Sequence, residues 1–280
     1  MKILIHGGFF SESSQSDETK HKKQEALLEI IKKGYNHLLN HNALETVIYT
    51  SSLLEDCPLF NAGIGSLIQG DGKIRMSAAI MDGKSSTFSG VINIENVKNP
   101  VLVAEKLLLE EDRVLSGDGA KIFATSKGFE SFSTETKERR SEYNNKLPSS
   151  KTGTVGCVVL DQKGDLAAAT STGGKGFEIP GRVSDSATIA GNYANKYCAV
   201  SCTGVGEDII NNALAVKIVT RVTDGQSIES AFDKTFQELA GFDGFAGAIG
   251  IDSKGNICWK ESHPKIVFAT YDGEELDLFE

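Results

Sequence analysis

The sequence changes character at Gly153-Thr154, and this junction constrains the fold more than any other stretch of the chain. Residues 131–151, which precede it, are polar and charged and offer little to bury. Residues 154–160, which follow it, form a short apolar run typical of a buried strand. A disordered linker that enters a buried strand through Gly-Thr is the arrangement expected of a chain that cuts itself before a threonine.

Cleavage between Gly153 and Thr154 would give Thr154 a free α-amine beside its own hydroxyl. A threonine hydroxyl is a weak nucleophile until a base removes its proton. An α-amine with a pKa of about 7.7–8.0 can accept that proton near neutral pH. One residue would then supply both nucleophile and base. Because a β-branched residue at the start of an ordinary strand looks the same, the interpretation depends on the motifs around it.

The composition fits a single large domain or two small ones. The chain has 280 residues, of which 40% are hydrophobic and 24% charged, as in ordinary globular proteins. Its net charge of −9 argues against a nucleic acid or an anionic membrane as partner. The sequence contains no run of about eighteen apolar residues, so we expect no helix that spans a membrane. The apolar stretch at the start of the chain is too short for a signal peptide. We therefore expect a cytoplasmic protein.

The cysteines and histidines do not predict a metal site. There are five of each, scattered along the chain without the spacing of zinc ligands. We expect free thiols, no cofactor and no catalytic metal.

Hydrophobic periodicity predicts strands and helices in a similar order in both halves of the chain. The expected strands span residues 2–5, 74–81, 88–94, 154–160, 166–170, 197–203, 245–252, 256–260 and 266–270. The expected helices span 24–39, a segment after the cap Asn42, 101–109 after the cap Asn99, 119–125, 208–220 and 227–239. Strands, helices and further strands in each half predict two mainly antiparallel sheets packed face to face, with helices outside.

Two motifs after the junction carry groups suited to amide chemistry. Thr172 ends the strand that should pair with the strand beginning at Thr154, so its hydroxyl can orient the nucleophile. Arg182 and Asp185 lie three apart in a loop fixed by proline and glycine. An arginine matches a carboxylate and an aspartate matches an ammonium, so the pair can hold an α-amino acid. The alternative is a surface ion pair worth about 0–1 kcal/mol.

A third motif, Thr203-Gly204-Val205-Gly206, follows an apolar strand and precedes a helix. Its backbone N–H groups and the Thr203 hydroxyl can stabilise an oxyanion. The same pattern suits a loop that cradles a phosphate, although it lacks the third glycine of a dinucleotide fingerprint. Both interpretations remain open from these residues alone.

Taken together, the motifs resemble those of the plant-type L-asparaginase/isoaspartyl peptidase family, which are N-terminal-nucleophile hydrolases of the threonine type. The resemblance extends from His6 to about Gly250. The matching blocks are His6-Gly-Gly8, Cys57-Pro-Leu-Phe-Asn-Ala-Gly-Ile-Gly65, Met81-Asp-Gly83, Gly153-Thr-Val-Gly156, Thr170-Ser-Thr-Gly-Gly174, Pro180-Gly-Arg-Val-Ser-Asp-Ser186 and Ser201-Cys-Thr-Gly-Val-Gly206.

The resemblance implies a fold and a maturation step. The fold is a four-layer αββα sandwich over residues 1–280, which form one domain. Autocleavage would give an α-subunit of residues 1–153, whose residues 131–153 form a flexible linker, and a β-subunit of residues 154–280. Mature relatives are homodimers of such cleaved units, and they bind a sodium ion through backbone carbonyls of the segment Leu54 to Gly65.

The resemblance also implies roles for individual residues. Arg182 and Asp185 would bind the substrate's α-carboxylate and α-amine, and Gly204 and Gly206 would line the substrate pocket. The catalytic residues would be Thr154, Thr172, Thr203, Gly204 and Asn61.

The activity that the resemblance implies is hydrolysis of the side-chain amide of L-asparagine and of short β-aspartyl peptides. Two alternatives stay within the same fold: an aspartylglucosaminidase-like enzyme and a protease like the threonine aspartase. A third, of a different class, is a non-catalytic protein whose glycine loop binds a phosphorylated ligand and whose chain stays uncut.

Four differences from the family concern the substrate pocket rather than the catalytic groups. Phe9-Phe10 replaces a run of glycine and alanine and would alter the pocket wall. Ser77 replaces a common aspartate, and Ser184 replaces a glycine between Arg182 and Asp185. Residues 262–268 also depart from the usual ending. These differences leave the preferred substrate open.

Overall fold

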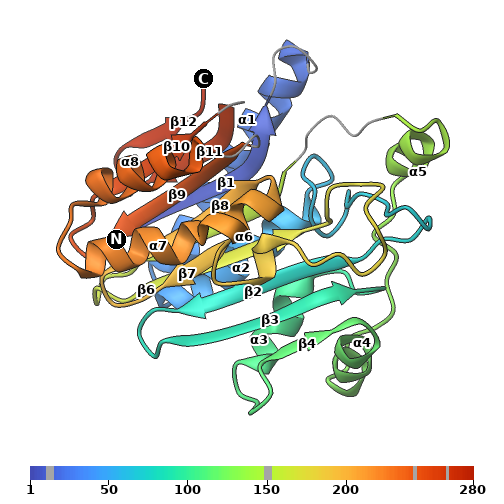
Figure 1. Ribbon diagram of the computed structural model, residues 1–280. Coiled ribbons are helices and arrows are strands. Elements are labelled where there is room, and N and C mark those ends of the chain that lie inside the picture. Colours follow the sequence, from blue (N-terminus) through green and yellow to red (C-terminus); the bar gives the residue numbers. More distant parts are fainter. Residues whose placement is uncertain (11–15, 148–152, 242–244, 263–264) are drawn as a thin grey trace.

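Two β-sheets packed face to face form the centre of the protein, and helices cover both outer faces (Figure 1). The computed structural model describes the chain except residues 11–15, 148–152, 242–244 and 263–264. The large sheet has the strand order β12-β11-β1-β5-β6-β2-β3-β4, and the small sheet has the order β10-β9-β8-β7. Among the described strand pairs only β3 and β4 run parallel. The expected four-layer αββα sandwich with mainly antiparallel sheets is confirmed.

The strands are β1 (Lys2–Phe10), β2 (Met76–Asp82), β3 (Thr87–Ile94), β4 (Val114–Ser116), β5 (Val155–Leu160), β6 (Leu166–Thr172), β7 (Asn192–Ala194), β8 (Cys198–Gly204), β9 (Ala246–Asp252), β10 (Ile257–Glu261), β11 (Lys265–Tyr271) and β12 (Leu276–Leu278). The helices are α1 (Asp17–Leu38), α2 (Ala43–Asp56), α3 (Pro100–Leu107), α4 (Gly117–Ser126), α5 (Lys137–Asn144), α6 (Gly206–Asn212), α7 (Leu214–Thr223) and α8 (Ile228–Leu239). No helix among the described residues is long and apolar enough to cross a membrane.

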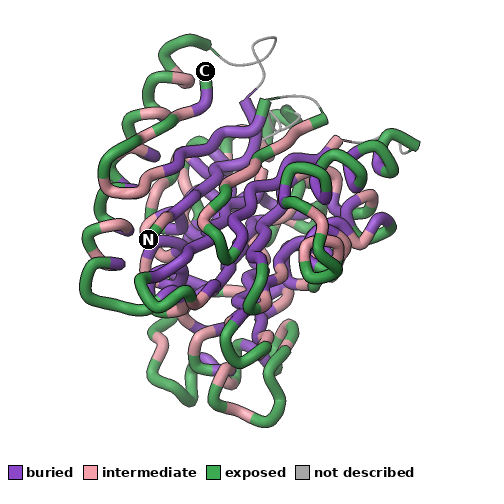
Figure 2. Tube along the Cα trace, turned by 90° about the vertical axis from the view of Figure 1, so that its left-hand side faces the viewer, coloured by how far each residue is buried: buried purple, intermediate pink, exposed green. Residues whose placement is uncertain are grey.

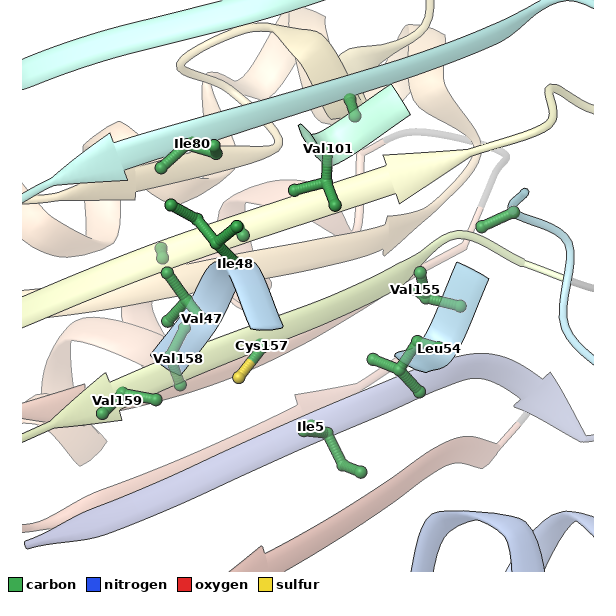
Figure 3. Packing of buried hydrophobic residues seen from close by; sticks show 14 of the residues in the cluster. Ile5, Val47, Ile48, Leu54, Ile80, Val101, Val155, Cys157, Val158 and Val159 are labelled. Carbon is green, nitrogen blue, oxygen red and sulfur yellow. The ribbon is translucent and has the colours of Figure 1, made fainter. Parts of the chain in front are cut away.

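The main core lies between the large sheet and the helices α1 to α3. Figure 3 shows Val47 and Leu54 of α2 packed against the strands, beside Cys157 of β5. All three side chains are fully buried, and burial of each aliphatic side chain stabilises the fold by about 1.5–3 kcal/mol. Buried residues fill the centre of the molecule, and exposed residues follow its outer helices and loops (Figure 2).

A second core lies between the small sheet and the helices α7 and α8. It is built on Ile218 and Phe232, which are fully buried. The main core also contains Ala199 of β8 and Ile249 of β9, so it packs the small sheet against the large one.

Two helix starts differ in how they are capped. Asn42 accepts a hydrogen bond from the backbone of Glu45 and forms a complete capping box, as its position predicts. Asn99 is the N-cap residue of α3 with Pro100 at the first helical position, as predicted, but its side chain makes no cap bond. Its amide donates instead to the carbonyl of Ser52 and to Asp56 of α2.

The helix expected at residues 208–220 is two helices, α6 and α7. Ala213 separates them with the left-handed angles φ 54° and ψ 44°, a conformation that interrupts the helical hydrogen-bond ladder. The three-residue strands β4, β7 and β12 were not predicted, because three residues are too few to show a period.

The segment expected to be a flexible linker contains the helix α5. Thr136 caps the helix, and Arg139 is buried and donates to the carbonyl of Gly65 at 2.8 Å. Tyr143 donates to the carbonyl of Gly70 at 3.2 Å. The expectation of an unstructured segment is therefore wrong for this part of residues 131–153. The anchors are polar contacts to distant loops, and hydrophobic periodicity cannot detect them. Residues 148–152 lie outside the described part of the chain.

Candidate active site

The hairpin of β5 and β6 brings Thr154 and Thr172 to the same end of the large sheet. Val155 pairs with Ser171 in the antiparallel register, so the next residue outward on each strand is one of the two threonines. Both line a cavity of about 340 Å³. The turn at residues 162–164 sets this register, and the proximity that the sequence predicts is confirmed.

Thr154 is nearly buried, with 7% of its surface exposed. Its hydroxyl lies 3.2 Å from the hydroxyl of Ser186, which is fully buried. Sequence analysis gave Ser186 no role, because a single serine in a loop has no spacing that marks it. The structure places it in direct contact with the candidate nucleophile.

Thr203 and Gly204 end β8 beside the junction. The Thr203 hydroxyl is buried and has no hydrogen-bond partner within the described residues. A Cβ added to Gly153 would lie 2.5 Å from this hydroxyl, so Thr203 faces the residue before Thr154. Gly204 has φ of 148°, and a Cβ there would collide with the carbonyl of Phe245. Only glycine lets the backbone pass this close, and the Gly204 segment borders the cavity.

Arg182 and Asp185 both line the same cavity as Thr154. A Cβ added to Gly206 would lie 2.7 Å from the Arg182 guanidinium and 2.8 Å from the Asp185 carboxylate, so Gly206 packs against both. Burial raises the pKa of Asp185 to about 7, although the nearby Arg182 charge opposes this shift. The carboxylate is therefore poised to gain from a cation placed beside it.

Glu207 also lines the cavity, and sequence analysis gave this residue no role. Its two carboxylate oxygens accept from Arg182 at 2.7 and 2.9 Å. The hydrogen bond from Arg182 lowers the pKa of Glu207 to about 2. Lys175 also reaches Glu207, at 3.3 Å. The partners are 25 and 32 residues apart in sequence, a distance at which no local pattern links them.

Asn61 lies outside the group of described residues that line the cavity. It is fully buried, and its amide donates to the carbonyl of Gly174 at 2.5 Å. The backbone carbonyl of Asn61 accepts a hydrogen bond from the backbone N–H of Gly173 at 2.9 Å. Asn61 therefore fixes the turn that follows Thr172 and acts on the cavity through that turn.

A buried polar network lies behind β5, the strand that follows Thr154. The His6 ring lies 2.9 Å from the Ser201 hydroxyl, which lies 2.7 Å from the Thr170 hydroxyl. Burial lowers the pKa of His6 to about 3, so the ring is neutral at physiological pH. A Cβ on Gly156 would collide with both His6 and Ser201. The network joins one strand of the small sheet to two strands of the large sheet.

The residues that differ from the family occupy different places. Phe9 and Ser184 line the cavity. Phe10 packs away from it against Phe279, with ring centroids 6.4 Å apart. Ser77 is buried and accepts from the backbone of Asn93 at 3.1 Å. Of these four positions, Phe9 and Ser184 are the ones that can influence a bound substrate directly.

Comparison with known proteins identifies the family. Residues 1–279 match the family described as asparaginase. The chain belongs to the asparaginase family. It is 44% identical to an isoaspartyl peptidase/L-asparaginase of Nostoc sp., over 98% of this chain and 93% of the relative. It is 37% identical to the isoaspartyl peptidase of Escherichia coli, over 91% of this chain and 88% of the relative. It is 34% identical to a plant-type L-asparaginase of Pyrococcus furiosus, over 95% of each chain.

This asparaginase-family member is accordingly an enzyme of the amidohydrolase and peptidase class. Membership favours the hydrolase over the non-catalytic phosphate-binding alternative. Within the described residues no group of three or more histidine, cysteine or acidic side chains is arranged to hold a metal ion.

Proposed function

We propose that the chain cuts itself between Gly153 and Thr154 into residues 1–153 and 154–280. The new N-terminal threonine then hydrolyses the side-chain amide of L-asparagine and of short β-aspartyl peptides. The observation that carries this proposal is the meeting, in one cavity, of Thr154 with the opposite charges of Arg182 and Asp185. The relatives named isoaspartyl peptidase/L-asparaginase support it.

The charged residues of the cavity orient the substrate. Arg182 would bind the α-carboxylate and Asp185 the α-ammonium of the aspartyl moiety. The Arg182 guanidinium already forms an ion pair with Glu207, and this pair holds the guanidinium in position. The substrate's side-chain carbonyl then extends towards Thr154.

The reaction proceeds through an ester on Thr154. Its hydroxyl attacks the side-chain carbonyl carbon while its α-amine accepts the hydroxyl proton. The Thr203 hydroxyl and the Gly204 backbone N–H would stabilise the oxyanion. The C–N bond breaks, the amine returns the proton to the departing nitrogen, and ammonia or an amino acid leaves. Water then hydrolyses the ester and releases L-aspartate.

Thr172 and Ser186 position the nucleophile. Ser186 contacts the Thr154 hydroxyl directly at 3.2 Å. Thr172 borders the same cavity from the paired strand, and its hydroxyl accepts from the backbone of Gly174 at 3.2 Å. Asn61 supports this turn from behind.

The activity is expected to depend on pH through two groups. Asp185, with its pKa raised to about 7 by burial, must be ionised to bind an ammonium, and the Thr154 amine must be neutral to act as a base. Both groups take up a proton as the pH falls. We therefore expect kcat/KM to fall below about pH 8 and to approach a slope of two below about pH 6.

Bound substrate should change that dependence. The substrate's ammonium stabilises the Asp185 carboxylate, which then stays ionised in the complex. As the pH falls, only the Thr154 amine gains a proton, so kcat should fall with a slope of one over the same range. Steady-state kinetics from pH 5.5 to 8.5 measures both profiles. If kcat/KM and kcat both fell with a slope of one at low pH, the role given to Asp185 would be contradicted.

We propose that the loop from Leu54 to Gly65 binds a structural sodium ion. The backbone carbonyls of Pro58 and Phe60 converge at Gly65, where an added Cβ would lie 2.6 and 2.9 Å from their oxygens. Such uncharged oxygen donors suit a hard cation. The residues present thus fit a cation whose part is structural.

Removal of sodium is expected to lower the melting temperature. An ion that binds only the folded state at 100 times its Kd stabilises that state by about 2.7 kcal/mol, which corresponds to several degrees for a protein of this size. Thermal unfolding in sodium chloride and in choline chloride of equal ionic strength measures the difference. Equal melting temperatures in the two salts would count against the site.

The cavity of about 340 Å³ favours small substrates over glycosylated asparagine or a folded protein. Rates with asparagine, a β-aspartyl dipeptide and glycosylasparagine test the proposed function. Hydrolysis of the first two supports it, and turnover of glycosylasparagine alone would favour the aspartylglucosaminidase-like alternative.

We also propose that the mature enzyme is a homodimer of cleaved units, in keeping with the resemblance of its motifs, and that it acts in the cytoplasm. All five cysteines are free thiols, as is usual in reducing compartments.

A further inference from the structure

The helix α5 lies at the edge of the molecule, away from both sheets (Figure 1). Its partners are loops that border the cavity. Arg139, Arg140 and Tyr143 all donate to backbone carbonyls of the loop formed by residues 65–72. Three successive polar anchors therefore hold one face of the helix against this loop.

The ring of Tyr143 also stacks on the ring of Phe177. Their centroids are 5.3 Å apart and their planes meet at 9°, within the range of favourable aromatic pairs. Phe177 has φ of 55°, a left-handed conformation that residues with large side chains rarely adopt. Such a conformation persists only where surrounding contacts hold it. The backbone of Phe177 donates to the carbonyl of Ile68 at 2.9 Å, and the Tyr143 ring adds a second contact from outside.

The position of Phe177 is transmitted to the cavity within the loop of residues 173–178. The Glu178 carboxylate accepts from the backbone of Lys175 at 3.1 Å, so both sides of this turn move together. Lys175 lines the cavity, and its ammonium lies 3.3 Å from Glu207. Glu207 is the residue that pairs with Arg182. A displaced Phe177 would therefore loosen the group that holds the Arg182 guanidinium.

The other end of the same loop is fixed without α5. The amide of Asn61 donates to the carbonyl of Gly174, and the backbone carbonyl of Asn61 accepts from Gly173. These bonds hold the turn that directly follows Thr172. Loss of the contact with α5 should therefore disturb the substrate-binding side of the loop and leave Thr172 in place.

We propose that α5 stays docked after cleavage and that Tyr143, through Phe177, is a positioning residue for substrate binding. The residues of α5 that make these contacts all precede Gly153, so the cut breaks none of their bonds. This inference rests on the proposed function and assigns the helix before the cut a part in the mature site.

The test measures KM and kcat for asparagine with the cleaved enzyme. In Tyr143→Ala we expect KM to rise about two- to tenfold, the scale of one aromatic pair. We expect kcat to stay within about twofold, because Asn61 still holds the turn beside Thr172. Tyr143→Phe keeps the ring and loses only the hydroxyl, so it should restore most of the binding.

A second variant tests whether the two rings act as a pair. Phe177→Ala should raise KM by about the same factor as Tyr143→Ala, and the double variant should raise it no further. Tyr197→Ala is the matched control. Tyr197 is also partly exposed under a cation, with Lys196 5.0 Å from its ring centroid, but it lies outside the residues that line the cavity. Its KM should equal that of the unaltered enzyme.

Failure of this inference is distinguishable from failure of the proposed function. An unchanged KM in Tyr143→Ala, a fall in kcat alone, or additive effects of the two substitutions would refute the positioning role while the hydrolase stands. A Tyr143→Phe variant as impaired as Tyr143→Ala would also refute the role of the ring. If the unaltered cleaved enzyme hydrolyses neither asparagine nor a β-aspartyl dipeptide, the proposed function fails and this inference falls with it.

Discussion

Thr154→Ala is expected to yield a single 30.0 kDa chain that neither cuts itself nor hydrolyses asparagine. The substitution removes the only atom of residue 154 able to attack a carbonyl, so activity should fall by at least about a thousandfold. The fold should persist, because the change deletes a hydroxyl and a methyl group at the start of β5, at a cost of about 1–2 kcal/mol. Denaturing gel electrophoresis measures cleavage, release of ammonia from asparagine measures activity, and circular dichroism measures the fold.

Thr154→Ser is the matched control for this variant. It keeps the hydroxyl and the later α-amine, so cleavage and some activity should remain. Two bands from Thr154→Ala, or turnover by its uncut chain, would refute the assignment of the nucleophile.

Arg182→Ala is expected to abolish tight substrate binding while leaving cleavage intact. It removes the fork that would hold the α-carboxylate, and the loss of one partner of a buried charge pair costs about 2–5 kcal/mol. KM for asparagine should therefore rise by roughly a hundredfold. Cleavage should proceed, since Gly153 lies beside Thr203 and Phe9 rather than beside Arg182.

The matched control is Arg221→Ala. Arg221 also pairs with a glutamate, Glu238, but does so between α7 and α8 and outside the cavity. It should leave KM unchanged. A KM for Arg182→Ala equal to that of the unaltered enzyme would show that another group binds the carboxylate.

The sequence predicts the parts of this site that lie on regular elements. The spacing of Thr154 and Thr172 around a short turn predicts their proximity, because antiparallel pairing leaves one register. Arg182 and Asp185 could be found because they stand three residues apart in a loop with strong local constraints.

The remaining parts depend on contacts that no local pattern records. Glu207 meets Arg182 only because α6 begins beside the 180–186 loop, and Ser186 reaches Thr154 across 32 residues. The helix α5 has a single buried residue, Arg139, so its anchors are polar bonds to distant loops. Such contacts arise from tertiary packing and are beyond the reach of periodicity.

The order of strands in the large sheet has a consequence for the mature enzyme. β1, from residues before the junction, lies between β11 and β5, which follow it, and β5-β6 lies between β1 and β2. The two products of the proposed cleavage would thus share one sheet and could not separate without breaking its strand pairing. Before the cut, unfolding and refolding involve one molecule. After it, recovery from denaturant becomes a bimolecular encounter, so the midpoint of unfolding should rise with protein concentration.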